Sequence, residues 1–261
     1  MLTKENYFSI ENKYISNSRI SDWLKDKHYF YQKHITGDIE NKKTIPMLIG
    51  SACDCWLTDS RKAFELQYNV VARRNLKNPP SDVIEITQSQ YDEIVGICES
   101  VERQDAYKAM KGHTTQKILT MPMELGLFCG ICGVPDFFKI DGKTAVITDL
   151  KSAERADSPI KYYYHCLDYG YFRQAAMYKI LLRYNFKDVE KIIFRHITVQ
   201  KEENIYGVYT FILDDERIAM EEENILSNIL PMIAKEKDFL PRNTKWSDAI
   251  VIGALNNDDD F

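Results

Sequence analysis

Long apolar runs and leader-like segments are absent from this 261-residue sequence. A membrane-spanning helix needs about 20 mostly apolar residues in succession, and no such stretch occurs. The first residues also lack the basic segment followed by an apolar run that marks a secretory signal. We therefore expect a soluble, cytoplasmic protein with no membrane partner.

An excess of basic residues is absent as well. The net charge is −5, which argues against a protein that coats nucleic acid without specificity. It does not exclude a DNA enzyme, because metal-binding carboxylates and a local basic channel can coexist. Internal repeats and low-complexity linkers are also missing, so we expect one domain over residues 1–261. Residues 1–17 should form an N-terminal arm or short strand, and residues 254–261 an acidic, flexible tail.

Cysteine motifs are few. The six cysteines occur in a chain without an export signal, so we expect free thiols. Cys129 and Cys132 form a C-x-x-C, but no second C-x-x-C accompanies it, as a zinc site of the usual kind would require. We expect these two residues to be small, buried hydrophobic side chains.

Hydrophobic periodicity predicts an alternation of helices and strands. A helix begins near Ser18, and its basic side would either contact phosphates or face solvent. Thr87 and Gln90 form a capping box for a helix that reaches about residue 110. Another helix should run from Asp214 to about residue 237, interrupted at Pro231. Strands are expected at 64–72, 118–127, 132–140, 190–199 and 205–213, and a further helix at 171–184.

A β-hairpin between residues 133 and 153 is the feature around which the chain is organised. Asp141-Gly142 suits a two-residue hairpin turn between runs of β-forming residues. With that turn, Asp136 lies opposite Ile147 and diagonal to Asp149, at roughly 7–8 Å between backbones. Side chains alternate along a strand, so Asp149 and Lys151 share one face. Two carboxylates and one ammonium group should therefore converge.

Such a cluster of carboxylates favours a divalent cation. Mg²⁺ prefers oxygen ligands and is commonly held by one or two carboxylates together with substrate phosphate. The metal would activate water and polarise a phosphoryl oxygen, while Lys151 would orient the water or the phosphate. A solvated hairpin face is the alternative for an Asp-x-Lys triplet taken alone. The preceding Pro135-Asp136 favours the metal site.

These motifs resemble a known nuclease superfamily. Pro135-Asp136, a spacer of 12 residues and Asp149-Leu150-Lys151 are similar to the PD-(D/E)XK signature. The run from Arg173 to Tyr178 resembles the Q-x-x-x-Y helix of RecB-type nucleases, which places Gln174 and Tyr178 one helical turn apart. The segments LIGSACDCWL and DLKSAERADSPIKYYYHCLDYGYFRQAAMY look like the RecE (exonuclease VIII) branch of phages and prophages. Lambda exonuclease and Cas4 nuclease cores are more distant relatives, and the likeness runs from about residue 18 to 240.

The resemblance implies an α/β fold, with a central mixed β-sheet flanked by helices, and it implies roles for individual residues. Catalysis would depend on Asp136, Asp149 and Lys151, and metal would be held by Asp54, Asp136, Asp149 and the backbone carbonyl of Leu150. Gln174, Tyr178, Ser152 and Arg173 would contact substrate, and Glu124 is a weaker ligand candidate that could instead only solubilise the surface.

Asp54 departs from the usual family pattern. It lies on a helix opened by Pro46, four residues after Gly50, where relatives often carry histidine in a G-x-x-x-H pattern. An aspartate keeps a hard oxygen ligand, which suits Mg²⁺ or Mn²⁺. The alternative is an aspartate that only faces solvent.

The resemblance implies a metal-dependent DNA exonuclease that acts at duplex ends, in phage- or prophage-type recombination. The cofactor would be Mg²⁺, with Mn²⁺ able to replace it. No iron–sulfur cluster is expected, because no cysteine follows Cys166. A homo-oligomer and a single-strand annealing protein partner are compatible with the family. Two alternatives remain: a single-strand or flap nuclease or endonuclease of the RecB/Cas4 type, and a catalytically silent DNA-binding scaffold. The aromatics at 162–164 and 169–172 could stack on unpaired bases or pack in the core.

Overall fold

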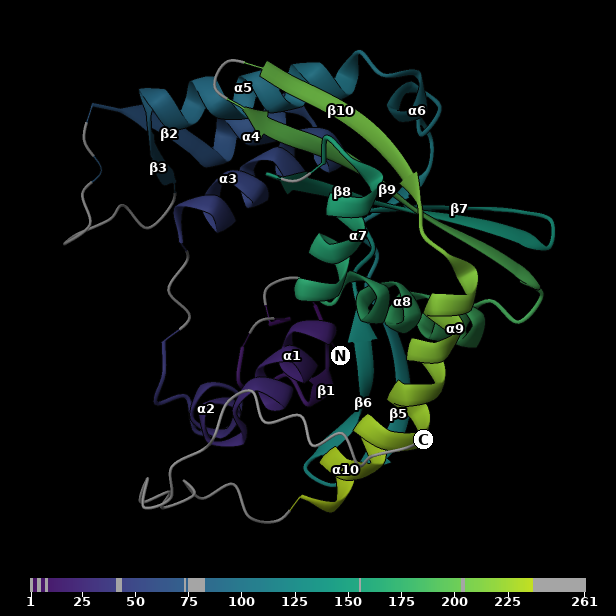
Figure 1. Ribbon diagram of the computed structural model, residues 1–261. Helices are drawn as coiled ribbons and strands as arrows, with labels where there is room; N and C mark the ends of the chain where they lie inside the picture. The colour runs from purple at the N-terminus through teal and green to yellow at the C-terminus, as the bar shows by residue number, and fades with distance from the viewer. Residues whose placement is uncertain are drawn as a thin grey trace, which may run out of the picture.

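A five-stranded mixed β-sheet, in the order β10-β9-β8-β7-β4, crosses the middle of the protein (Figure 1). In the computed structural model, the described residues are 2–3, 6–7, 9–40, 44–72, 74, 83–154, 156–202 and 205–236. β8 and β9 run parallel, and the other neighbours are antiparallel. The strands are β4 (Thr114–Thr115), β7 (Phe137–Asp141), β8 (Thr144–Ala153), β9 (Lys191–Glu202) and β10 (Ile205–Ile212). This sheet confirms the expected α/β architecture.

The β7–β8 hairpin has a different register from the one expected. Asp141 pairs with Thr144, so the two loop residues are Gly142 and Lys143 instead of Asp141 and Gly142. Gly142 has φ +55°, which glycine adopts without steric cost at the first central position of a hairpin turn. Continuing the register one pair past Phe137 and Thr148 places Asp136 opposite Asp149. The shift is two residues, so every side chain keeps its predicted face.

The predicted strand 132–140 is two strands in two sheets. β6 (Phe128–Gly133) belongs to a second sheet, β1-β6-β5, with β1 (Tyr14–Ile15) and β5 (Leu119–Leu125). The chain leaves this sheet at Val134 and enters the central sheet at Phe137. Pro135 has no amide N–H to donate to a strand partner, which explains the break. The Pro-Asp motif therefore lies at the junction of the two sheets.

One face of the central sheet is covered by α3 (Ile45–Asp54), the π-helical segment η2 (Cys55–Asp59), α4 (Arg61–Gln67) and α5 (Gln88–Glu102) (Figure 1). Trp56, Phe64 and Ile94 are buried in this layer. The strand expected at 64–72 is wrong in its first half, because Ser60 accepts a hydrogen bond from the Ala63 amide and starts α4 there. The remaining elements here are β2 (Tyr68–Val71), β3 (Ile84–Thr87) and α6 (Asp105–Lys108). The capping box of Thr87 and Gln90 is confirmed.

The other face packs against a second helical layer and a larger core. Met177 and Leu181 of α8 are completely buried there, beside Phe194 and Ile147 of the sheet. Asp214 caps the last long helix as expected, and a π-helical turn separates its two halves just before Pro231. The elements of this layer are α7 (Pro159–Asp168), α8 (Tyr171–Asn185), α9 (Asp215–Asn224), η3 (Ile225–Ile229) and α10 (Leu230–Lys235).

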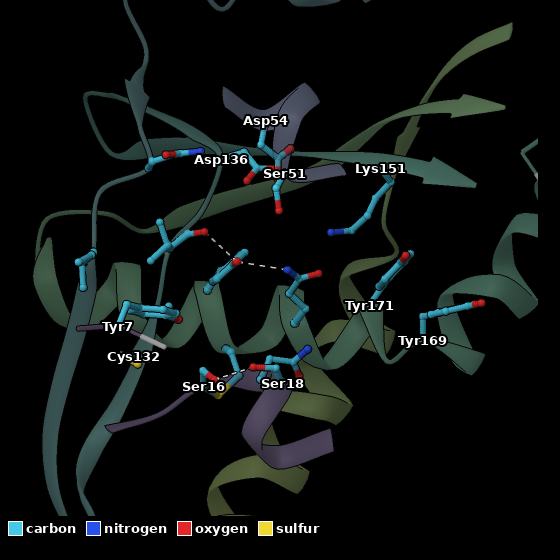
Figure 2. A pocket seen from close by; sticks show the side chains of 18 residues that line it. Tyr7, Ser16, Ser18, Ser51, Asp54, Cys132, Asp136, Lys151, Tyr169 and Tyr171 are labelled. Atoms are coloured by element: carbon cyan, nitrogen blue, oxygen red, sulfur yellow. Dashed lines mark hydrogen bonds between the residues drawn. The ribbon is translucent and has the colours of Figure 1, made fainter. Parts of the chain in front are cut away.

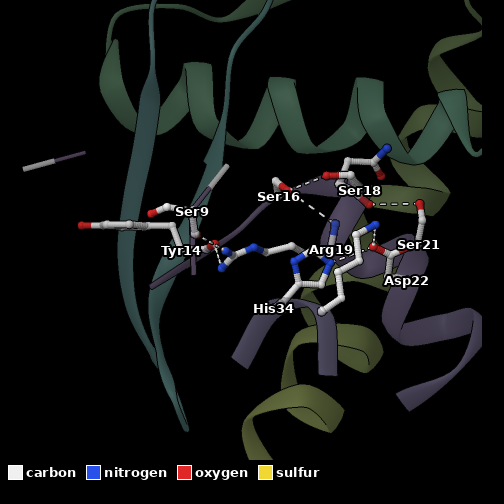
Figure 3. Close-up of polar contacts among 10 residues, drawn as sticks. Ser9, Tyr14, Ser16, Ser18, Arg19, Ser21, Asp22 and His34 are labelled. Carbon is white, nitrogen blue, oxygen red and sulfur yellow. Dashed lines mark hydrogen bonds and ion pairs between the residues drawn. The ribbon is translucent and has the colours of Figure 1, made fainter. Parts of the chain in front are cut away.

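The N-terminal arm is held by a buried arginine. The Arg19 guanidinium donates to the carbonyls of Ser9, Asn12 and Tyr14, at 3.0, 2.6 and 3.1 Å (Figure 3). These bonds keep the arm beside β6, where β1 pairs. Arg19 lies on α1 (Asn17–Lys25), and the expected single helix breaks after it into α2 (Lys27–Tyr31) and η1 (Gln32–Thr36).

The basic side of this helical region is partly neutralised. Asp22 accepts from Lys33 at 2.9 Å and contacts Nε2 of His34 at 2.7 Å, as Figure 3 shows for His34. Lys27 forms an ion pair with Glu236. These pairs leave less positive charge for phosphate contacts than the sequence pattern indicates.

The six cysteines are free, as expected, but they do not all lie in the core. Cys132 is buried and Cys129 is exposed, so the prediction of two buried side chains is wrong for Cys129. Alternation along β6 puts the two side chains on opposite faces of the strand, and only that of Cys132 faces the interior. Within the described part of the chain, no helix is long and apolar enough to cross a bilayer. The acidic tail at 254–261 lies outside the described residues.

Candidate active site

Asp149 and Lys151 extend from the same face of β8, as strand alternation requires. Asp149 is 1% exposed, and its Oδ2 forms an ion pair with the Lys151 ammonium. Burial tends to lower the pKa of Lys151, but Asp149, Tyr171 and Asp136 raise it above its ordinary value. The ammonium group therefore stays charged at neutral pH. It also lies 4.8 Å from the centre of the Tyr171 ring, a cation–π contact.

Asp136 lies beside this pair at the junction of the two sheets. Its Oδ2 accepts a 2.7 Å hydrogen bond from the backbone amide of Leu150. Burial raises the pKa of Asp136 well above its ordinary value, and the charges of Asp149 and Asp54 raise it further. The hydrogen bond and Lys151 oppose that rise without cancelling it. Asp136 and Asp149 are brought together as predicted, although directly opposite one another and not on a diagonal.

Asp54 enters the same cluster from the end of α3. Figure 2 shows its carboxylate next to Asp136 and Ser51, with the Lys151 side chain reaching toward them. Burial and the charge of Asp149 raise the pKa of Asp54 to about 7, against the opposing effect of Lys151. A solvent-facing aspartate would have no such partners. The structure thus places Asp54 at the predicted position.

The cluster fits a hard divalent cation by its chemistry. It consists of three carboxylates and a single ammonium, and burial together with the neighbouring carboxylates raises the pKa values of Asp54 and Asp136. Carboxylate oxygens are the ligands that Mg²⁺ and Mn²⁺ prefer. Among the described residues, however, no three acidic, His or Cys side chains are already arranged around one point. The Lys151 ammonium forms an ion pair with the Asp149 carboxylate, and so it occupies the place beside Asp149 where a metal ion would bind.

Gln174 and Tyr178 hold the carboxylates in place. Gln174 Nε2 donates to Asp149 Oδ1 at 3.4 Å and to the Tyr178 hydroxyl at 3.2 Å, and that hydroxyl donates to the Val134 carbonyl at 2.9 Å. Both residues lie on α8, four positions apart. A Cβ on Gly133 would lie 2.7 Å from the Tyr178 ring, so only glycine permits this approach. The Q-x-x-x-Y pair thereby connects α8 to both halves of the motif.

Three other predicted residues lie outside this cluster. Arg173 donates to Asn17 Oδ1 at 2.9 Å and to Ser21 Oγ at 2.6 Å, so it ties α8 to α1 instead of lining the cavity. Ser152 is exposed and lines a neighbouring cavity. Glu124 is exposed on β5, near the end of that strand remote from the Leu119–Gly133 pair. It lines a separate hollow with Met123 and Phe128, and the structure does not bring it to Asp136.

The carboxylates open into a cavity of about 520 Å³, shown in Figure 2. Several of its residues were not singled out as site residues from the sequence. Ser51 precedes Asp54 by three residues on α3, a spacing that puts both on one helix face and could have identified it. Ser16, Asn17 and Ser18 come from the start of α1, and Tyr7 from the arm. Tyr169 and Tyr171 form the wall beside Lys151. Both belong to the aromatic run 169–172, for which the sequence is compatible with base stacking and with core packing.

The sequence pattern also did not identify a buried histidine, His196, on the strand next to Asp149. His196 pairs with Asp149 across β8 and β9 and is 0% exposed. Its Nδ1 lies 2.7 Å from the hydroxyl of Tyr162, which also accepts a hydrogen bond from Thr198. Burial lowers the pKa of His196 well below its ordinary value, and Lys151 lowers it further, so the ring is neutral. The periodicity of β9 gave no signal for this role.

Comparison with known proteins agrees with this geometry. A family model described as "PDDEXK-like domain of unknown function (DUF3799)" matches residues 16–238. The crystal structure of a candidate exonuclease from Eubacterium rectale superposes with a TM-score of 0.65 at 20% identity, covering 96% of this chain and 95% of that one. The structure of SSO0001 is 19% identical over 53% of this chain and 62% of its own, and its TM-score of 0.28 carries no argument. No curated protein matches this chain.

Proposed function

The chain belongs to the PDDEXK-like family, and from that premise we propose that it is a metal-dependent deoxyribonuclease that degrades DNA from duplex ends. The observation that supports this most directly is that Asp54, Asp136 and Lys151 line one cavity, with the buried Asp149 paired to Lys151 behind them. Carboxylates that hold a divalent metal, beside a cation that contacts the phosphate, suit metal-assisted hydrolysis of a phosphodiester.

The proposed metal is Mg²⁺, which Mn²⁺ can replace. Asp54, Asp136 and Asp149 would hold it, with the Leu150 carbonyl as a further oxygen donor. When bound, the metal supplies Lewis acidity that activates water and neutralises charge on the phosphate. Binding would require the Lys151 ammonium to leave the Asp149 oxygen with which it now pairs.

Lys151 would then act on the substrate. Its pKa is raised, so it would remain an ammonium and serve better as a hydrogen-bond donor than as a general base. A donor next to the cleaved phosphate stabilises the charge that develops there. Gln174 and Tyr178 would act as positioning residues, because their contacts go to Asp149 and Val134.

The choice of an exonuclease rests on two further supports. The Eubacterium rectale protein of similar fold is described as a candidate exonuclease. The segments around Asp54 and between Asp149 and Tyr178 also resemble RecE. A role in phage-type recombination, a homo-oligomer and a single-strand annealing partner follow from the same resemblance and belong to the proposal. The cytoplasmic location expected from the sequence belongs to it as well. No iron–sulfur cluster is included in it.

Two other functions use the same core. A single-strand or flap nuclease, or an endonuclease, would need the same carboxylates and lysine. A silent DNA-binding scaffold would not, and the buried charge cluster counts against it, because like charges that serve no chemistry are costly to bury.

Degradation of end-labelled linear duplex, compared with covalently closed circles, tests the proposal. We expect metal-dependent loss of linear DNA alone with Mg²⁺ or Mn²⁺, and none with EDTA. Lys151→Ala should lose about 10²-fold or more in rate, the range for removing a group that stabilises transition-state charge. Lys143→Ala is the matched control, because Lys143 lies on the same hairpin with a 70% exposed side chain. Cleavage of closed circles would indicate an endonuclease, and no cleavage of any DNA would favour the scaffold.

A further inference from the structure

A second cavity, of about 340 Å³, adjoins the first at the charged cluster. Asp54, Lys151 and Tyr171 line both cavities, so the two spaces meet at the candidate active site. The walls of the second cavity come from α3, η2, α5, β8, β9 and the start of α8, and they are mostly apolar. They include Leu57, Ile97, Val101, Leu150, Ile197 and Val199.

Gly50 borders this cavity and has no packing reason to be glycine. It lies in the interior of α3, where glycine is less favourable than alanine. A Cβ built on Gly50 meets no atom within 4 Å apart from its chain neighbours and the backbone of its own helix, and its φ is not in the left-handed region. Gly96 on α5 is the contrast, because a Cβ there would lie 2.1 Å from the Tyr206 ring. Neighbouring side chains explain Gly96, whereas the space beside Gly50 is open.

The surroundings define what could fill that space. An occupant would meet apolar walls on the inside and the Lys151 ammonium, the Asp54 carboxylate and the Tyr171 ring at the entrance. A group that is flat and largely apolar, and that is joined to a phosphodiester at the entrance, satisfies both environments. The aromatic ring at the entrance favours a planar group over an aliphatic one.

We propose that this second cavity binds the base of a nucleotide joined to the cleaved phosphate, and that Gly50 is glycine to leave room for it. The inference rests on the proposed nuclease function and adds the recognition of an unpaired, unstacked base. The first cavity would then take the rest of the strand, and the strand would pass between α3 and Tyr171 where the two cavities meet.

Abasic substrates test this without altering the protein. Each duplex carries one tetrahydrofuran residue at a defined position in the labelled strand, and degradation by the wild-type protein is followed in time. Stacking of one base contributes about 1–3 kcal/mol by substitution, which corresponds to roughly 5- to 150-fold in rate. We expect a pause of that size when the abasic residue reaches one of the two positions that flank the cleaved bond. Uniform degradation through the abasic residue would overturn the proposal.

Gly50→Leu and Gly50→Ala provide the second test. Both fill open space and improve helix propensity, so neither should lower the thermal unfolding midpoint. Gly50→Leu should slow cleavage of normal DNA about tenfold or more and remove the pause at the abasic residue. Gly50→Ala adds a smaller group to the same cavity and should slow cleavage of normal DNA less than Gly50→Leu does. Equal slowing of normal and abasic DNA by Gly50→Leu would indicate damage to Asp54, one turn away, and would also overturn the proposal.

These results are distinguishable from failure of the nuclease assignment. If the wild-type protein cleaves no DNA with any metal, the nuclease function fails. If it cleaves normal and abasic DNA alike, only the base-binding cavity fails.

Discussion

The backbone amide of Leu150 donates a 2.7 Å hydrogen bond to Oδ2 of Asp136, which connects the two halves of the motif across the end of the β7–β8 hairpin. Leu150 lies between Asp149 and Lys151, so this one bond sets the position of Asp136 relative to both. It holds a carboxylate where burial and two neighbouring carboxylates oppose its charge.

Asp136→Asn should stabilise the metal-free protein and abolish metal binding. The amide oxygen of asparagine can still accept from Leu150, but the side chain no longer carries a negative charge beside Asp54 and Asp149. We expect the free energy of unfolding in EDTA at pH 8 to rise, because the folded state no longer has to bury this charge beside two other carboxylates. Thermal melts with and without Mg²⁺ measure this. A less stable variant in EDTA would contradict the conflict inferred at this site.

The stability of the metal-free protein should fall as pH rises from about 4 to 7 because of Asp54. Its pKa is about 7 in the folded protein, against an ordinary value of 3.8. In that window the folded state binds more protons than the unfolded state, so each titrating carboxyl contributes a slope of at most about −1.4 kcal/mol per pH unit. Buried His196 has the opposite effect on stability. It stays neutral in the folded protein but takes up a proton in the unfolded chain as pH falls below its ordinary pKa of 6.5, which favours unfolding at low pH.

The Asp54 contribution is therefore isolated by subtraction. Unfolding free energies of the wild type and of Asp54→Asn, measured in EDTA from pH 4 to 8, share the His196 effect. Their difference should change in favour of the variant as pH rises. A pH-independent difference would mean that Asp54 titrates normally in the folded protein.

Asp54→Asn should weaken metal binding, whereas Asp59→Asn should not. Asp54 shares the cavity with Asp136, while Asp59 is exposed at the end of η2, five residues further along the chain. We expect roughly a tenfold or greater loss of Mn²⁺ affinity for Asp54→Asn, because one charged oxygen ligand is removed. Titration calorimetry or the electron paramagnetic resonance signal of free Mn²⁺ gives the affinity independently of cleavage. Equal affinities for the two variants would remove Asp54 from the site.

Tyr178→Phe should reduce cleavage more than it reduces binding of DNA. The change removes the hydroxyl that donates to Val134 and accepts from Gln174, so Asp136 and Asp149 lose a shared support. We expect the rate at saturating DNA to fall about 10-fold or more, in line with the loss of a positioning residue around a metal site. Tyr184→Phe on the same helix is the control, because Tyr184 is 41% exposed. A loss confined to DNA affinity would instead indicate direct substrate contact.

Arg173→Ala should lower stability without changing how DNA binding depends on salt. Its guanidinium donates to Asn17 and Ser21, and truncation leaves these part-buried acceptors without that donor. We expect a loss of about 1–3 kcal/mol in the free energy of unfolding. Arg183→Ala on the same helix removes an exposed ion pair with Glu222 and should cost about 1 kcal/mol or less. A shallower salt dependence for Arg173→Ala would restore the substrate-contact role predicted from the sequence.

The sequence by itself determined the chemistry of the hairpin and of α8. Strand alternation fixes the common face of Asp149 and Lys151, and a register error of two residues leaves that face unchanged. Helical spacing likewise fixes the common face of Gln174 and Tyr178. Both facts depend only on local periodicity. The sequence also predicted correctly that helices begin after Thr87 and Asp214, because N-capping is a local interaction.

Tertiary structure alone decided which side chains from distant segments meet. Arg173 lies on α8 next to Gln174, but its side chain donates to Asn17 and Ser21 of α1. Only the packing of α1 against α8 reveals these partners. Glu124 lies away from the site because β5 and β6 form a separate sheet, which the chain leaves just before Pro135. Asp54, His196 and Gly50 acquire their significance from contacts or open space across long sequence separations. Periodicity carries no information about such contacts, because they arise when whole layers pack together.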